Sequence, residues 1–480
     1  MKLTTSLDDN IKLLKETFPI GKSYDLITRN LCLRNTRAYW IGINGFCANE
    51  ILQQLISDLQ NPSYNEYETV DNLLQFVASK IGYIQTETCN DWDKIVKNIL
   101  SGPSALFIDG FDQAVILDTR KYPTRGIEEP DTEKVTRGSK DGFVETVVFN
   151  TALIRRRIRN PRLSFEVKAV GTETKTDVVI AYIDGTVDEQ LLNTIKDKIT
   201  NINVPSLTMG AKSLEELLIK KRWCNPLPQV RFTQRPDVAC SFLLEGYIAL
   251  IVDNSPSVMV FPCNLFQFTQ NAEDYYQNPS VGTYYRFLRF ACTSISLLLM
   301  PVFLLLGMYA DSMPDWLQVV TSKEVKPVEL FIYVIIIELG LDLFRYSSAH
   351  ASSTLSNSLG LIGGLIIGDI AIELNWASKE VIFYGAVTLL TTLSISSQEF
   401  GNAIRLYRFF LVFVTGFFGI WGFGIGFLLI LLSIATTPTL TGHNYMWPLI
   451  PFCWAALRTL LFRYPTAKYE LKVKNNKAKD

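Results

Sequence analysis

The sequence has 480 residues, of which 19% are charged and 48% hydrophobic, and its formal net charge is −1. This length accommodates two or three domains, and the near-zero net charge argues against nucleic acid as the main partner. Only two histidines, His350 and His443, are present, and the eight cysteines form no CxxC pair. We therefore expect no metal centre, no cofactor, and reduced thiols rather than a disulfide framework.

Residues 1–120 are expected to form a lead-in and a first small α/β subdomain. The lead-in, 1–30, is polar, is predicted to be helical, and has no apolar core of signal-peptide type, so the N-terminal part is expected to be cytoplasmic. Short apolar runs then alternate with helical patterns. The predicted strands are Tyr39–Phe46, Tyr83–Cys89, Ala105–Asp109 and Ala114–Asp118, and the predicted helices are Ala48–Leu59, Val70–Ser79 and Asp91–Leu100.

A charged loop, 121–140, precedes a second α/β subdomain with its linker, 141–283. The loop contains the adjacent acids Glu128 and Glu129, and the predicted helix Val144–Ile158 leads into a basic run, Arg155, Arg156, Arg157 and Arg159. Nucleic-acid binding by the arginines and acid–base chemistry by the acids are alternatives. Arginine pairs well with carboxylates through two parallel hydrogen bonds, so a charge network between subdomains or subunits is the favoured interpretation.

The rest of the second subdomain again alternates strands and helices. The predicted strands are Leu163–Val170, Asp177–Tyr182, Tyr247–Val252 and Val258–Phe261, and the predicted helices are Val187–Ile202, Ser213–Lys221 and Asp237–Leu244.

Residues 284–462 contain three runs without a charged residue: Phe290–Ala310, Val381–Ser397 and Phe409–Met446. A helix that crosses a bilayer needs about 20 mainly apolar residues, which the first and third runs supply. The sequence therefore predicts a membrane protein in the lipid bilayer: a cytoplasmic α/β region of two small subdomains, followed by an all-α transmembrane bundle of about 4–6 helices. A basic tail, 463–480, follows.

The stretch Val328–Ser347 is apolar but carries Glu338, Asp342 and Arg345 on one side of a helix. One interpretation is an interfacial helix in which Asp342 and Arg345 pair with each other. The other is a charged face along an ion pathway, because ionisable groups at membrane depth are costly and face water or a partner. The sequence leaves both open.

The stretch Ser356–Glu373 places Gly360, Gly364 and Gly368 at four-residue spacing on one helix face, followed by Asp369. Small residues at this spacing let helices approach closely in a membrane. We expect this helix, with Asn357 near its start and Glu373 at its end, to serve helix packing or to line a pore.

Lysine and arginine in short flanking segments mark the cytoplasmic side of a membrane. Arg286 with Arg289, a loop containing Arg405 and Arg408, and the basic tail all fall on that side, which requires an even number of crossings, four or six. Either 328–347 lies in the interface, or the short, proline-containing segment Trp447–Leu461 also crosses.

Several long stretches resemble one family: GSKDGFVETVVFNTALIRRRIRNPRL (138–163), GTETKTDVVIAYID (171–184), RPDVACSFLLEGYIALIVDNSPSVMVFP (235–262) and SNSLGLIGGLIIGDIAIE (356–373). They are similar to the A subunits of the spore germination GerA family. The resemblance implies the inner membrane of a bacterial endospore and a homo-oligomer, a pentamer, that releases monovalent cations. It also implies germinant-receptor B and C subunits, or a small membrane partner for an accessory, response-amplifying channel, and no catalytic residue.

Three other classes of function are alternatives to a channel. A non-conducting scaffold or regulatory membrane subunit would use the same glycines to pack a monomeric bundle. An enzyme is not expected, because the sequence contains no GxxxxGK[ST], HExxH or GxSxG motif. A secondary transporter would show internal repeats with broken helices, and no repeat is visible.

Overall fold

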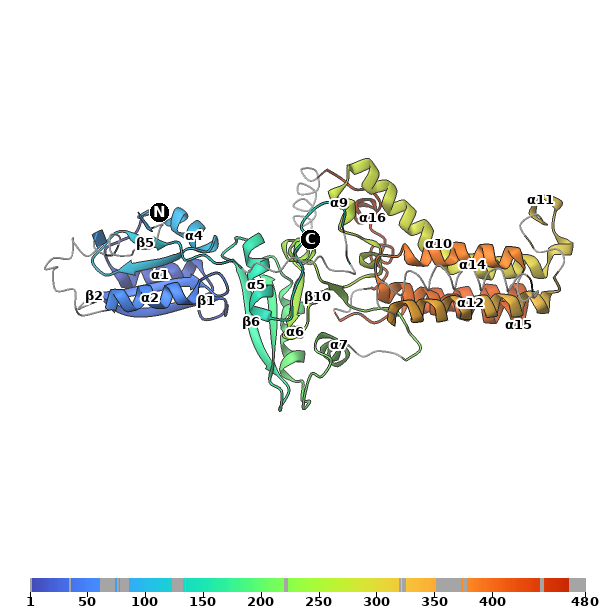
Figure 1. Cartoon of the computed structure of the whole chain (residues 1–480), viewed down its shortest axis with the longest axis horizontal. Helices are drawn as coiled ribbons and strands as arrows, with labels where there is room; N and C mark the ends of the chain where they lie inside the picture. The colour runs from blue at the N-terminus through green and yellow to red at the C-terminus, as the bar shows by residue number, and fades with distance from the viewer. Residues whose placement is uncertain are drawn as a thin grey trace. The chain divides into compact units, whose positions relative to one another are not determined.

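The computed structural model describes residues 2–33, 36–60, 74–75, 77, 86–122, 133, 135–219, 223–318, 321, 325–350, 373, 378–440 and 444–465. The chain divides into two compact units. The first unit comprises Met1–Lys220 and Val230–Pro262, and the second comprises Lys221–Gln229 and Cys263–Asp480. The first unit holds two β-sheets with their helices, and the second holds the long helices (Figure 1).

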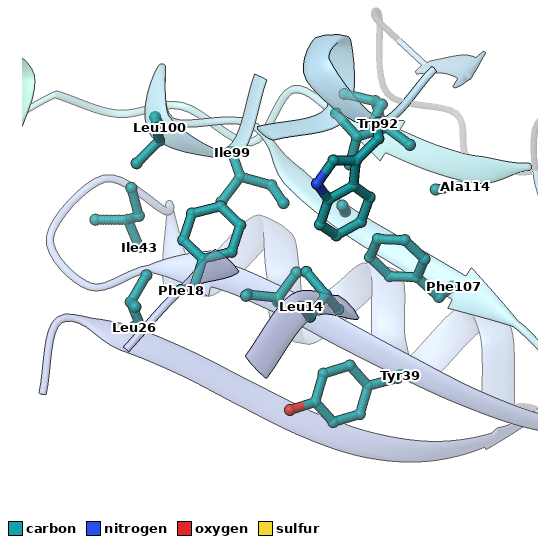
Figure 2. Packing of buried hydrophobic residues seen from close by; sticks show 14 of the residues in the cluster. Leu14, Phe18, Leu26, Tyr39, Ile43, Trp92, Ile99, Leu100, Phe107 and Ala114 are labelled. Carbon is teal, nitrogen blue, oxygen red and sulfur yellow. The ribbon is translucent and has the colours of Figure 1, made fainter. Parts of the chain in front are cut away.

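The first sheet is antiparallel and has the strand order β1-β2-β4-β5-β3. Its strands are β1 (Leu26–Leu33), β2 (Thr36–Ile43), β3 (Thr86–Cys89), β4 (Ser104–Ile108) and β5 (Ala114–Leu117). The helices are α1 (Leu7–Thr17), α2 (Asn49–Gln60) and α4 (Trp92–Leu100). On one face, Leu14 and Phe18 meet Phe107 and the α4 residue Ile99, as Figure 2 shows. On the other face α2 covers alternate residues of the same strands, so β4 is buried on both sides.

The second sheet is also antiparallel and has the order β6-β7-β9-β10-β8. Its strands are β6 (Leu163–Val170), β7 (Thr176–Ile183), β8 (Arg231–Thr233), β9 (Ile248–Val252) and β10 (Val258–Phe261). The helices are α5 (Val147–Arg157), α6 (Glu189–Thr200), α7 (Ala211–Leu218) and α8 (Pro236–Leu244). Side chains of α5 and α8 pack on one face of this sheet.

The two sheets repeat one topology. In each, two strands in a hairpin are followed by a helical region, the edge strand on the far side, a helix and a second hairpin. The repetition extends to single hydrogen bonds. The N–H of Leu7, the first residue of α1, donates to Asp109 Oδ1 at 3.1 Å, and the N–H of Val147, the first residue of α5, donates to Asp253 Oδ1 at 3.1 Å.

A buried asparagine marks the same position in both copies. Asn10 bonds through its side-chain amide to the N–H and C=O of Thr4, and Asn150 bonds in the same way to Val144. The first unit is therefore a duplicated α/β fold, which the sequence patterns did not reveal.

One prediction for the first unit is wrong. The lead-in 1–30 is helical only over α1, and its last residues form the edge strand β1. The polar sequence of β1 is explained by its position at the edge of the sheet. Leu31 and Leu33 are buried, whereas most other residues of the strand are exposed or partly exposed and can be polar. The predicted helix Val70–Ser79 lies mostly outside the described residues, and the other strand and helix predictions match described elements within a few residues.

The second unit contains α10 (Pro279–Met308), α12 (Pro327–His350), α14 (Lys379–Leu393), α15 (Gln398–Ala435) and α16 (Trp454–Leu461), with short turns η1 (Leu265–Thr269), α9 (Glu273–Tyr276), η2 (Ala310–Ser312) and α11 (Asp315–Gln318). Helices α10, α12, α14 and α15 lie side by side (Figure 1). Among the described helices, α10 and α15 are long and apolar enough to cross a membrane.

Contacts between side chains fix the directions of these helices. Helix α14 is antiparallel to α10, since Ser296 meets Thr392 and Phe303 meets Tyr384. Helix α12 is antiparallel to the first half of α15, since Phe331 packs on Phe417 while Glu338 bonds to Arg408. The first half of α15 is parallel to α10, because Arg408 bonds to Ser296 and Gly419 lies beside Tyr309. Helices α12 and α14 are therefore parallel to each other.

Helix α15 is a hairpin of two helices rather than one rod. At Gly419 the backbone has φ 59° and ψ −135°, which breaks the helix. Across the break, Tyr407 and Ser433 hydroxyls lie 2.7 Å apart, although a straight helix would separate residues 26 apart by about 39 Å. The interpretation of Phe409–Met446 as one span is thus wrong. The placement of Arg405 and Arg408 in a loop is also wrong, because both lie within α15.

Candidate functional site

The centre of the helical bundle contains a buried ion pair between Arg408 of α15 and Glu338 of α12. Arg408 Nε donates to Glu338 Oε1 at 2.8 Å, and Nη2 donates to Oε2 at 2.9 Å. Arg408 is 3% exposed and Glu338 is fully buried. This two-point geometry is the strong form of an arginine–carboxylate contact.

Polar groups from the two remaining helices complete the ion pair. Arg408 Nη1 donates to the backbone carbonyl of Ser296 at 2.9 Å and lies 3.2 Å from the hydroxyls of Ser296 and Thr392. Those two hydroxyls are 2.7 Å apart. One guanidinium therefore joins α10, α12, α14 and α15 at a single level, and its bonding leaves it no free donor nitrogen.

A second ion pair lies about one helical turn away, toward the end of α12. Arg405 Nη1 lies 3.2 Å from Asp342 Oδ1, with both side chains partly exposed. Arg405 Nε and the nearby Arg345 Nη1 are buried atoms without a hydrogen-bond partner among the described residues. The charges of α12 and α15 thus form a row, closed at Glu338 and incompletely paired at Arg345.

The acidic residues of the predicted charged face of α12 have their partners on α15. Glu338 and Asp342 bond across to α15, so the pairing is between helices and not the contact of Asp342 with Arg345 that one of the two interpretations expected. In the sequence, Arg405 and Arg408 were expected only to mark the cytoplasmic side of the membrane. The signal that pointed to their role was the presence of two arginines one turn apart directly before an apolar run.

The glycine stretch is not placed by the structure. Asn357, Gly360, Gly364, Gly368 and Asp369 lie outside the described residues, and Glu373 is helical and exposed. Because α12 and α14 are parallel, the last residue of α12 and the first residue of α14 lie at opposite ends of the bundle.

A loop that joins α7 to β8 in the first unit belongs to the second unit. Its Asn225 donates to the Thr437 hydroxyl at 2.8 Å and accepts from the Tyr407 hydroxyl at 3.3 Å. Its Pro228 carbonyl accepts from the buried Tyr445 hydroxyl at 2.7 Å. The chain therefore passes between the two units three times. The loop between two of these passages bonds to Tyr407, the residue before Arg408.

A second buried ion pair holds the start of α10. Arg289 bonds to Asp274 through both carboxylate oxygens, at 2.6 and 2.9 Å, and to the Thr269 carbonyl at 2.6 Å. Arg286 donates to the Thr459 and Leu460 carbonyls of α16, both at 3.0 Å. These arginines thus fix α9 and α16 against the first turns of α10.

Only the arginine side of the predicted charge network in the first unit is described. Arg155 is buried between the two copies of the fold, where it donates to Asp25 at 2.7 Å and to the Leu163 carbonyl at 2.9 Å. Glu128 and Glu129 lie outside the described residues.

The other three arginines of the run lie near the surface. Arg156 stacks over the Tyr122 ring, Arg157 pairs with Asp141, and Arg159 bonds to the Ser101 hydroxyl. The run therefore serves contacts within the first unit in the part of the chain that the structure describes.

No group of three or more metal-ligating side chains occurs among the described residues. No disulfide joins the cysteines of that part, and burial raises the pKa of the Cys240 thiol to about 12, which makes it unreactive at neutral pH.

Comparison with known proteins places the chain in a family. The family model described as "Bacillus/Clostridium GerA spore germination protein" matches residues 12–475. Stage V sporulation protein AF of Bacillus subtilis (strain 168) is 37% identical over 465 residues, which cover 97% of this chain and 93% of that protein. Spore germination protein A1 of the same organism is 31% identical over 403 residues, which cover 83% and 81%.

A crystal structure of the N-terminal domain of the A subunit of the Bacillus megaterium spore germinant receptor GerK3 also matches. It is 26% identical and covers 54% of this chain and 96% of its own, with a TM-score of 0.41. The family match spans nearly the whole chain, through both α/β copies and the helical bundle. The chain belongs to the GerA family of spore germination proteins.

Proposed function

We propose that the chain is a membrane protein of spore germination that assembles into an ion channel. It acts as a channel that releases monovalent cations, or as an accessory channel that amplifies the germinant response. The observation that carries this proposal is the row of charges between α12 and α15. Ionisable side chains within an apolar bundle are costly and commonly mark an ion pathway.

The bonding of the row indicates where such a pathway runs. Arg408 and Glu338 are closed to solvent, so they hold the bundle together rather than line a conduit. Arg405 and Asp342 at the end of the row are partly exposed, so water or a neighbouring subunit can reach this end. We therefore place the conduit between subunits of an oligomer, a pentamer by analogy with the family, and not inside one bundle.

The helix directions support six crossings. Helices α10, α12, α14 and the two halves of α15 account for five, and the predicted helix 356–373 would return the chain from the end of α12 to the start of α14. Of the described cationic residues, Arg286, Arg345, Arg405 and Arg458 lie near one end of the bundle and Lys326 and Lys379 lie near the other. The arginine-rich end is then cytoplasmic, with both termini on that side.

Membership of the family supports a cellular setting. We place the protein in the inner membrane of the endospore, with the first unit on the core side. Its partners would be copies of itself and either the B and C subunits of a germinant receptor or a small membrane protein. The glycine face at Gly360, Gly364 and Gly368 would pack against one of these partners or against its own bundle.

Reconstitution into liposomes tests conduction. The purified chain should release trapped K⁺ faster than protein-free liposomes do, and Arg345→Gln should change the rate by several-fold because it alters the charge at the open end of the row. Lys94→Gln, which removes an exposed charge of the first unit, is the matched control and should leave the rate unchanged. Native mass measurement of the detergent-solubilised protein gives the number of subunits.

The alternative is a non-conducting scaffold or regulatory subunit, and the closed Arg408–Glu338 cluster favours it, because such a cluster makes a bundle rigid. A correctly folded oligomer that releases no K⁺ above the protein-free rate would exclude the channel and leave the scaffold.

A further inference from the structure

We propose that the segment from Tyr445 to Phe462 lies flat in the cytoplasmic interface of the bilayer, where its aromatic side chains anchor the bundle among the lipid headgroups. This inference rests on the proposed function only in that it takes the helical bundle to cross a membrane. It assigns a lipid-binding surface to a segment whose length and composition had allowed a further crossing.

The segment carries an unusual amount of exposed apolar surface. Over its 18 residues, YMWPLIPFCWAALRTLLF, the single charged side chain is Arg458. Phe452 is 66% exposed and Trp454 is 60% exposed, and the other exposed apolar side chains are Trp447, Leu449, Ile450 and Phe462. In water such a strip would promote aggregation, so it requires an apolar or amphipathic cover.

The position of the segment along the bundle identifies that cover. Helix α16 is held against the first turns of α10, because Arg286 bonds to the Thr459 and Leu460 carbonyls and the Phe287 ring meets the Phe462 ring at 5.7 Å. The charge-free run of α10 begins at Phe290, only four residues or about 6 Å farther along the helix. The segment therefore lies at the level where hydrocarbon gives way to headgroups.

The chemistry of the segment suits that level. Tryptophan is enriched at the membrane–water interface, because its ring is apolar and its N–H remains able to bond to water or headgroups. Arg458 is exposed on the same short helix and can pair with a lipid phosphate. Phe287 of α10, whose ring packs on Phe462, is also exposed, so the apolar strip continues onto α10.

A helical crossing by this segment is excluded, because only its last part is a helix. Helix α16 has eight residues, about 12 Å, against about 30 Å of hydrocarbon. Together with the predicted helix 356–373, the hairpin at Gly419 gives six crossings without this segment. The geometry thus assigns 445–462 to the interface and 328–347 to the membrane interior.

Tryptophan quenching by brominated lipids tests the assignment on the full chain in liposomes. Bromines placed near the headgroups should quench Trp454 more strongly than bromines near the chain ends. Trp454→Phe should therefore lower the fraction of fluorescence quenched by the shallow bromines, and Trp447→Phe should act in the same direction. Trp40→Phe, which removes a buried side chain of the first unit, should raise that fraction slightly or leave it unchanged.

Quenching of Trp421 tests whether the bundle lies in the membrane at all, independently of the interfacial anchor. It is 78% exposed near the tip of the α15 hairpin, at the end of the bundle opposite α16. If Trp421→Phe lowers quenching while the changes at 447 and 454 do not, the bundle lies in the membrane and the interfacial anchor is wrong, as it would be if a second copy covered the strip. If no change at 421, 447 or 454 lowers quenching, the membrane placement itself fails.

Discussion

The carboxylate of Glu338 and the guanidinium of Arg408 meet in two hydrogen bonds, 2.8 and 2.9 Å long, near the middle of two antiparallel helices. Neither group has access to solvent, and the hydroxyls of Ser296 and Thr392 fill the remaining space around Arg408. Removing one partner of such a pair leaves an uncompensated buried charge, whereas removing both is far less costly.

Arg408→Gln or Glu338→Gln should accordingly destabilise the helical bundle by about 3–5 kcal/mol, because each leaves the other charge buried alone. Thermal unfolding of the detergent-solubilised chain measures the loss. The double change to glutamine should recover a large part of it. Arg37→Gln, in an exposed ion pair of the first unit, is the control and should have little effect. Equal losses for the single and double changes would show that the pair is not the source of the stability.

Gly419 makes a second prediction about the bundle. Its φ of 59° with ψ −135° is open mainly to glycine, and a Cβ at this position would lie 2.6 Å from the Tyr309 hydroxyl. Gly419→Ala should therefore destabilise the hairpin by ~1–3 kcal/mol, as judged by thermal unfolding.

Gly424 provides the matched control for that substitution. It lies in the second half of the same hairpin, is helical, and has nothing within 4 Å of an added Cβ. Gly424→Ala should be neutral or slightly stabilising, because alanine favours a helix over glycine. A straight α15 would instead gain stability from both changes, so that result would contradict the hairpin.

The α/β elements could be predicted from the sequence because their signals are local. The strand β4, for example, is buried on both faces and reads as a continuous apolar run. The hairpin in α15 has no such signal. The charge-free run contains five glycines, at 416, 419, 422, 424 and 426, and nothing in the neighbouring residues singles out Gly419 as the one that turns.

The candidate site was predictable only in part for a related reason. The charges of α12 stood out, because they interrupt an apolar stretch. Their partners on α15 are about 70 residues away, and the direction of each helix decides which arginine meets which acid. The duplication in the first unit could not be predicted, because the two copies share single residues, such as Asn10 and Asn150, and no long stretch of similar sequence.

The duplication predicts matched effects in the two copies. Asn10→Ala and Asn150→Ala should each remove two hydrogen bonds from a buried backbone turn, and each should destabilise the first unit by about 1–3 kcal/mol. Chemical denaturation of the full chain, followed by the fluorescence of Trp40 and Trp92, measures the effect in the first copy. Asn90→Ala, at a partly exposed position next to β3, is a suitable control, and a large effect in one copy alone would mean that the two turns are not equivalent.

The acid side of the pH profile should depend on Glu166 on strand β6. Burial opposes its ionisation, but hydrogen bonds from Lys196 and Tyr182 outweigh burial and hold the pKa of Glu166 below its usual range. Because the folded-state pKa is the lower one, the unfolded state takes up the proton first, and the stabilisation is present above the usual value of about 4.3 and is lost as the pH falls below it. Glu166→Gln should therefore unfold at a lower temperature than the wild type at neutral pH, and the difference should shrink on acidification. Glu87→Gln, in an exposed pair with Lys94, should show no such convergence, and a difference for Glu166→Gln that grew toward acid pH would contradict the assignment.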